Sequence, residues 1–159
     1  MPIRTGDIFT SPILKKINHM MSKQLKSLVY KLITIEANKD IGILAFRLLA
    51  VFSLIKAHGL PKIINFQETL THIPDPLGMG STFSAYYAVF ANVFCAILIA
   101  AGLFTRIAAI FILSITLSGL LIVHLNDPAK LQDMPLIYSI VFGFIAYTGA
   151  GKYSLDHNF

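Results

Sequence analysis

The stretch that decides the fold covers residues 91–117 and reads ANVFCAILIAAGLFTRIAAIFILSITL. Thr105 and Arg106 divide it, and each half belongs to a longer apolar run, residues 85–104 on one side and residues 107–123 on the other. Crossing the hydrocarbon of a bilayer takes about 20 apolar residues, and fewer where flanking side chains reach back to the interface. The two runs therefore predict two transmembrane helices joined by a minimal turn, which is an antiparallel hairpin.

Two further segments extend this pattern. Residues 41–59 and 135–150 are also apolar and nearly long enough to span, although Arg47 and Lys56 interrupt the first of them. The whole chain is 55% hydrophobic and 13% charged, against about 25% charged in a typical soluble domain, which argues against a water-soluble fold. Residues 61–84 are rich in proline and glycine and predict a long structured loop. The expected fold class is all-α, a bundle of four transmembrane helices.

A basic segment, residues 1–40, precedes this membrane domain of residues 41–159. Ser11 and Pro12 resemble an N-cap followed by proline in the first helical turn, and so predict the start of a helix. Its apolar residues fall on one stripe at spacings of three and four, with lysines off the stripe. The stripe is Leu14, Ile17, Met21, Leu25, Leu28, Leu32 and Ile35, and the lysines are Lys15, Lys16, Lys23, Lys26 and Lys31. We expect an interfacial amphipathic helix beside anionic lipid headgroups; a docking helix for a partner protein and a flexible basic tail are the alternatives.

The distribution of basic residues predicts the orientation in the membrane. The chain has 13 Lys and Arg against 8 Asp and Glu, a net charge of +5. Nine of the 13 fall on the side that holds the N-terminus, whereas the loops on the opposite side hold only Lys62 and Lys130. Because cytoplasmic segments carry the excess of Lys and Arg, we expect both termini in the cytoplasm. Since the charges flank membrane segments, no nucleic-acid partner is expected.

Arg47 is the main polar candidate within the predicted helices. It lies six residues past Ile41, about 9 Å into the bilayer, and an ionisable side chain there is a functional hypothesis by default. The alternative is an anchoring arginine that snorkels to the headgroups. Asn92 is expected near mid-bilayer, within reach of Arg47 if the first two helices are neighbours. Cys95, one turn away, either shares that face or is a small buried hydrophobe, and as a single cysteine it forms no intramolecular disulfide.

Two histidines are expected at the opposite side of the membrane. His58 and His124 end the first and third predicted helices, which run in the same direction, so both should lie at similar height. Lys56, Asp75 and Asp127 would join them in a polar cluster at the outer mouth of the bundle. Two histidines on facing helices can also bind haem, but there is no second histidine pair, and an interfacial polar role is the simpler interpretation. No metal site is predicted.

Four short motifs, in order over residues 41–156, resemble the DoxX family of small bacterial four-helix membrane proteins. They are Arg47 early in the first helix, HGLPK at residues 58–62, GLFTRIAA at residues 102–109 and GAGKYSLD at residues 149–156. Fourteen residues before the loop arginine the family usually has a glutamate, and this chain has Asn92. An amide there offers a hydrogen bond but no charge to neutralise Arg47, so a proton-shuttling glutamate cannot be transferred to this chain.

The resemblance implies an integral protein of the bacterial inner membrane. Some relatives are subunits of a thiosulfate:quinone oxidoreductase, so it further implies a subunit of a quinone-linked redox system, with quinone as a possible cofactor and a redox partner subunit. The candidate substrate or quinone pocket residues are Arg47, Asn92, Lys56, His58 and His124, with no catalytic residue identified. The alternatives are a non-catalytic scaffold that anchors a partner protein and a small-molecule carrier, which is disfavoured because the chain has no internal repeat. Whether the chain is an enzyme stays open.

Overall fold

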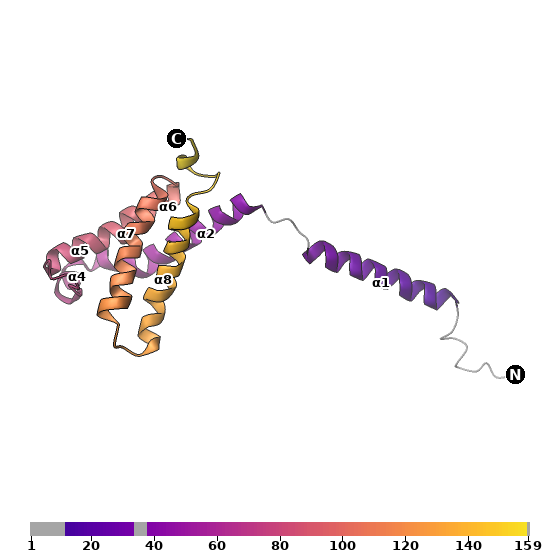
Figure 1. Cartoon of the computed structure of the whole chain (residues 1–159), viewed down its shortest axis with the longest axis horizontal. Coiled ribbons are helices and arrows are strands. Elements are labelled where there is room, and N and C mark those ends of the chain that lie inside the picture. The colour runs from indigo at the N-terminus through magenta and orange to yellow at the C-terminus, as the bar shows by residue number, and fades with distance from the viewer. Residues whose placement is uncertain (1–11, 34–37, 159) are drawn as a thin grey trace. The chain divides into compact units, whose positions relative to one another are not determined.

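The computed structural model describes residues 12–33 and 38–158, and within these ranges every regular element is a helix (Figure 1). The prediction of an all-α fold is therefore confirmed. The chain divides into two compact units, residues 1–37 and 38–159.

The first unit contains one described helix, α1, from Pro12 to Ile33. Met21, Leu25 and Leu28 of the predicted apolar stripe are exposed, as are the lysines at positions 23 and 26. The predicted N-cap Ser11 and the last stripe residue Ile35 lie outside the described residues. The helix itself is thus confirmed, with the three described residues of its apolar stripe exposed.

The second unit opens with a helix that is longer than predicted. It consists of α2 (Lys39–Leu54), the π-helical turn η1 (Ile55–Gly59) and α3 (Leu60–Ile64), without a break. The predicted end near Gly59 is wrong because Pro61 does not stop the helix. Proline lacks an N–H and usually disrupts a helix interior, but the wide turn η1 directly before it accommodates the ring. Lys62 donates from Nζ to the carbonyl of His58 at 3.1 Å, which supplies a side-chain donor at this irregular turn.

The remaining elements form three more helices and two short ones. In chain order they are α4 (Phe66–His72), α5 (Ser81–Val89), η2 (Phe90–Cys95), α6 (Ala96–Ala101), α7 (Thr105–Ser118), η3 (Gly119–Val123), α8 (Ala129–Thr148) and η4 (Leu155–Asn158). The predicted long loop therefore contains helices α3 and α4. η2 joins α5 to α6, and η3 extends α7, in each case as a π-helical turn.

Three helices among the described residues are long and apolar enough to cross a membrane: residues 39–64, 81–101 and 105–123. They match the first three predicted spans with shifted ends. Helix α8 has 20 residues, but Lys130, Gln132 and Asp133 in its first turns lower its hydropathy. The structure thus supports a helical membrane bundle with three candidate spans.

The predicted hairpin between the second and third spans is present, but its turn lies earlier than expected. Gly102 adopts a left-handed conformation at φ 70°, and the N–H of Leu103 bonds to the carbonyl of Leu98 at 2.9 Å, so α6 ends in a Schellman-type cap. Phe104 is also left-handed, at φ 50°, and α7 already begins at Thr105. The turn therefore consists of residues 102–104 instead of Thr105 and Arg106.

Small residues form much of the core, as expected where helices associate in lipid by close packing. Ala91, Ala96, Ala109 and Cys95 are all buried within it, and α7 and α8 lie side by side (Figure 1). Cys95 is 1% exposed among apolar neighbours, which confirms the interpretation of a small buried hydrophobe.

Gly59 allows the first two spans to touch. A Cβ at Gly59 would lie 3.0 Å from both the Asn92 carbonyl oxygen and Cγ2 of Val93, whereas a Cβ at Gly42 would meet nothing within 4 Å. Replacing glycine by alanine inside a helix otherwise gains about 1 kcal/mol. We expect Gly42→Ala to leave the thermal midpoint in detergent unchanged or raised, and Gly59→Ala to lower it. Equal midpoints for the two variants would contradict the close contact.

Candidate functional site

Arg47 is buried and donates hydrogen bonds to backbone carbonyls. Its side chain is 2% exposed, and its guanidinium donates to the carbonyls of Ala150 at 2.5 Å, Tyr153 at 2.8 Å and, more distantly, Ala100 at 3.5 Å. Two of these acceptors belong to residues 149–158, which follow α8 and which we call the C-terminal strap. A side chain early in the first span therefore fixes the end of the chain.

The strap in turn caps helix α7. The Asp156 carboxylate accepts hydrogen bonds from the N–H groups of Phe104 at 2.7 Å and Thr105 at 2.9 Å, and the Asp156 N–H donates to the carbonyl of Gly102 at 2.7 Å. Phe104 holds the position where Ser, Thr, Asp or Asn usually supplies this acceptor. Burial opposes the charged form of Asp156, but these hydrogen bonds and the positive charge of Arg47 outweigh it and hold its pKa below the ordinary value.

Gly102 makes room for this arrangement. A Cβ at Gly102 would lie 2.5 Å from Cβ of Ser154 and 2.9 Å from Nη1 of Arg47, and the left-handed backbone also favours glycine. Lys152 of the strap pairs with Asp40 at the start of α2, at 3.4 Å. The hairpin turn, the strap and the first helix thus pack against one another.

This placement of Arg47 differs from both interpretations of the sequence. The guanidinium does not snorkel to the surface, because it is buried, and its hydrogen bonds go to carbonyls instead of Asn92. Arg47 lies at the level of Ala100 in the second span. Ala100 is eight residues from Asn92, so the levels of Arg47 and Asn92 are about 12 Å apart along that helix. The carboxylate that acts on Arg47 is Asp156, from the other end of the chain.

A second set of polar side chains crosses the interior of the bundle. The hydroxyls of Ser53 and Tyr138 are 2.9 Å apart, and Ser139 donates to the Thr116 hydroxyl at 2.9 Å. The His58 ring packs edge to face on Tyr138, with centroids 5.2 Å apart. Asn92 is 3% exposed, in the π-helical turn η2 that packs against η1. We call this set, Ser53, His58, Asn92, Thr116, Tyr138 and Ser139, the central polar layer.

His58 has an unsatisfied ring nitrogen within the central polar layer. Its Nε2 is buried and has no hydrogen-bond partner among the described residues. A buried polar group without a partner costs about 1–3 kcal/mol, which a polar ligand can recover. His58 lies in η1 and Asn92 in η2, and π-helical turns occur frequently at functional sites. The layer meets the outer surface of the bundle at Ser53, whose side chain is exposed.

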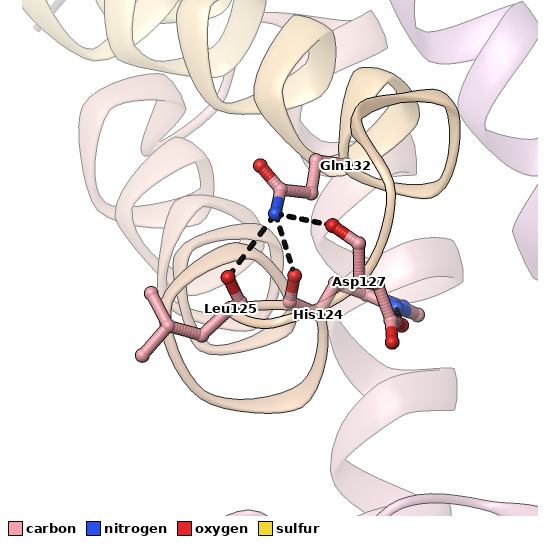
Figure 2. Close-up of polar contacts among 4 residues, drawn as sticks. All are labelled: His124, Leu125, Asp127 and Gln132. Carbon is pink, nitrogen blue, oxygen red and sulfur yellow. Dashed lines mark hydrogen bonds and ion pairs between the residues drawn. The ribbon is translucent and has the colours of Figure 1, made fainter.

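The other predicted histidine, His124, lies in a separate polar turn. Its Nδ1 is 2.8 Å from the Asp127 carboxylate. Figure 2 shows the amide nitrogen of Gln132 directed at the carbonyls of His124, Leu125 and Asp127, at 2.9, 3.2 and 2.9 Å. This network closes the connection between η3 and α8.

The predicted convergence of the two histidines is wrong. His58 is level with Tyr138 and His124 with Gln132, and six residues of α8, about 9 Å, separate these levels. The error arises because His58 lies inside a helix that continues to Ile64.

Of the other residues of the predicted outer cluster, Asp127 joins His124 as predicted, whereas Asp75 has different partners. Asp75 accepts hydrogen bonds from the N–H groups of Gly80 and Met79 and from the Ser84 hydroxyl, at the start of α5. Lys56 is exposed. Of the five predicted pocket residues, the structure brings His58 and Asn92 into one layer, leaves Lys56 exposed on the same turn η1 as His58, and places Arg47 and His124 elsewhere. No group of three His, Cys, Asp or Glu that could hold a metal occurs among the described residues.

Sequence reasoning missed Ser53, Tyr138 and Asp156. Ser53 and Tyr138 resemble ordinary members of membrane helices, and only their pairing across two helices distinguishes them. A signal for Asp156 was available, because a helix that begins after Phe104 has no local capping side chain.

Removing the guanidinium should release the strap. Hydrogen bonds to charged groups are worth about 1.5–3 kcal/mol each, so Arg47→Leu is expected to increase hydrogen exchange of the strap amides at least about tenfold. The amide of Asp156, which bonds to Gly102, is the most direct reporter. Lys56→Leu removes an exposed cation from the same long helix and should leave this exchange unchanged. Unaltered hydrogen exchange of the strap amides in Arg47→Leu would contradict the role of Arg47 in holding the strap.

Acid should release the strap as well. The pKa of Asp156 is lower in the folded protein than in the unfolded chain, where it is about 3.9. The charged carboxylate therefore stabilises the strap fully at pH values above the unfolded pKa. This stabilisation is lost as the pH falls through the pKa of the folded protein. Protease sensitivity of the strap, measured from pH 6 downwards, should therefore rise near and below pH 4. Asp156→Asn should make the strap sensitive at pH 6 and remove this pH dependence.

Comparison with known families matches residues 42–125 to DoxX, which covers more than half of the chain. No curated protein and no solved structure matches the chain. The match includes nearly all of the three candidate spans, with Arg47, His58 and Asn92, while Tyr138 and the strap lie beyond it. The chain therefore belongs to the DoxX family, as its motifs indicate, and is a helical multi-pass membrane protein.

Proposed function

We propose that the second unit spans a bacterial inner membrane four times, with both termini in the cytoplasm. Support for the fourth span comes from α8, which has 20 residues and packs along α7. Support for the orientation comes from the excess of Lys and Arg at the ends of the helices that share a side with the N-terminus. In this proposal residues 1–40 are a basic interfacial segment, beside anionic lipid, and residues 41–159 are the membrane domain.

We propose further that the protein is a subunit of a quinone-linked membrane redox system, with the quinone headgroup bound at the central polar layer. The observation that carries this is the buried Nε2 of His58, which has no partner among the described residues and lies beside Tyr138. A quinone carbonyl is an acceptor for the imidazole N–H, and lipophilic ligands bind in apolar sites with a few convergent polar groups. The exposed Ser53, bonded to Tyr138, marks the side from which a quinone dissolved in the lipid reaches the layer.

The other predicted residues have different roles in this proposal. Asn92 offers a second hydrogen-bonding group near mid-membrane, while Arg47 holds the strap and does not contact the quinone. Lys56 is exposed in η1, at the depth of the central polar layer, and His124 lies about 9 Å nearer the outer face, where a cation would attract an anionic substrate such as thiosulfate. Reduction of a quinone consumes two electrons and two protons, and the electrons come from a partner subunit that carries the electron donor.

The test is reduction of a quinone analogue by the full chain together with its native partner. His58→Phe preserves a ring against Tyr138 but removes the N–H, so turnover should fall about tenfold or more, with a raised KM for the analogue. His72→Phe, at an exposed histidine of α4, is the matched control and should behave as the unmodified protein. Unchanged kinetics in His58→Phe, with both variants folded, would reject the central polar layer as the quinone site.

A scaffold is the second candidate function. It is favoured by α1, which belongs to a compact unit of its own and exposes both apolar side chains and lysines to a partner. A partner at fixed stoichiometry that is lost when residues 1–37 are removed, together with no quinone reduction by the complex, would favour the scaffold over the redox subunit.

A further inference from the structure

A groove lies at the end of the bundle where the strap meets the start of α7. Its volume is about 610 Å³, within the range of small-molecule sites. It is lined by one residue of α2, the turn before α7 with its first residues, and the strap: Asp40, residues 104–107, residues 148–152, Ser154, Asp156 and His157. Neither the central polar layer nor His124 contributes to it.

The charges in the groove are unequally satisfied. Lys152 pairs with Asp40 at 3.4 Å, and Asp156 is occupied by the N–H groups at the start of α7. Arg106 is exposed and has no hydrogen bond or ion pair with any described residue. Its guanidinium lies over the strap, because a Cβ at Gly149 would be only 3.1 Å from its Nε. The groove therefore presents a free cation, beside a lysine whose ion pair is exposed and weak.

Apolar side chains flank the same cation. Phe104 and Ile107, on either side of Arg106 in the helical turn, are 61% and 57% exposed. They lie at the first residues of a candidate span, Thr105–Val123, where hydrocarbon gives way to headgroups. Exposed apolar side chains beside a free guanidinium match a molecule with an anionic head and an acyl tail.

We propose that this groove binds the phosphate of an anionic phospholipid. Arg106 forms a bidentate contact with the phosphate and Lys152 a second one, since guanidinium and phosphate geometries match. Phe104 and Ile107 contact the first carbons of the acyl chains. Inorganic phosphate shares the anionic chemistry but gains nothing from the two apolar side chains. This site is independent of the proposed quinone site.

The test measures lipid retained by the full chain in mild detergent, by native mass spectrometry during titration with phosphatidylglycerol or phosphatidylcholine. Phosphatidylglycerol should bind at one high-affinity site. Arg106→Gln should lower the affinity of this site about fivefold, and Arg106→Gln/Lys152→Gln should lower it further. Arg106→Lys keeps the charge and should retain part of the affinity, which separates lost binding from lost folding. Lys23→Gln/Lys26→Gln removes the same charge from α1 and should leave the high-affinity site intact.

Three results would overturn the proposal. One is equal retention of the two lipids. Another is loss of the tight site only in the α1 variant, which would place the lipid on that helix. The third is displacement by inorganic phosphate at concentrations comparable to phosphatidylglycerol, which would identify a soluble phosphate as the ligand.

Discussion

A buried arginine determines how the ends of this bundle fit together. A charged side chain inside a membrane helix costs several kcal/mol unless polar groups surround it, and Arg47 obtains them from carbonyls of the C-terminal strap. The strap can reach Arg47 only by crossing the end of the bundle, and this crossing brings Asp156 to the start of α7, where no local cap exists. One electrostatic requirement therefore fixes three parts of the chain: the first span, the hairpin turn and the strap.

The same requirement accounts for an uncharged interior. Because Asp156 acts on Arg47 from the end of the bundle, a carboxylate at position 92 is not needed to balance it, and Asn92 is compatible with a buried arginine. The central polar layer then contains hydroxyls, an amide and an imidazole but no carboxylate. Such a layer suits hydrogen bonding to a neutral ligand better than proton transfer through an acidic side chain. This favours a bound quinone headgroup over a glutamate-dependent proton path.

Hydropathy was sufficient to predict the three candidate spans, because a span is defined by the local run of apolar residues. The all-α fold, the hairpin and the approximate spans followed from it, and the family followed from short motifs. Apart from helix α4, which lies in the predicted loop, the errors involve contacts or turns that local patterns do not encode. Pro61 appeared to end a helix that the π-helical turn η1 prolongs, and the height of His58 was wrong for the same reason. The two strap carbonyls that accept from Arg47 lie more than a hundred residues away along the chain and could not be predicted from spacing.

The π-helical turns connect these errors to the candidate site. A π turn holds one more residue than an α turn, so every side chain after it is rotated by about 100° relative to a regular helix. In the first span this rotation follows Leu54 and precedes Pro61, and His58 packs inward on Tyr138. In the second span the corresponding turn carries the buried Asn92, and the two turns touch at Gly59. Both helices therefore depart from regular α-helical hydrogen bonding at the same depth, where His58 and Asn92 lie. Departures from regular geometry are expected at functional sites, and two of them at one depth favour a binding site there.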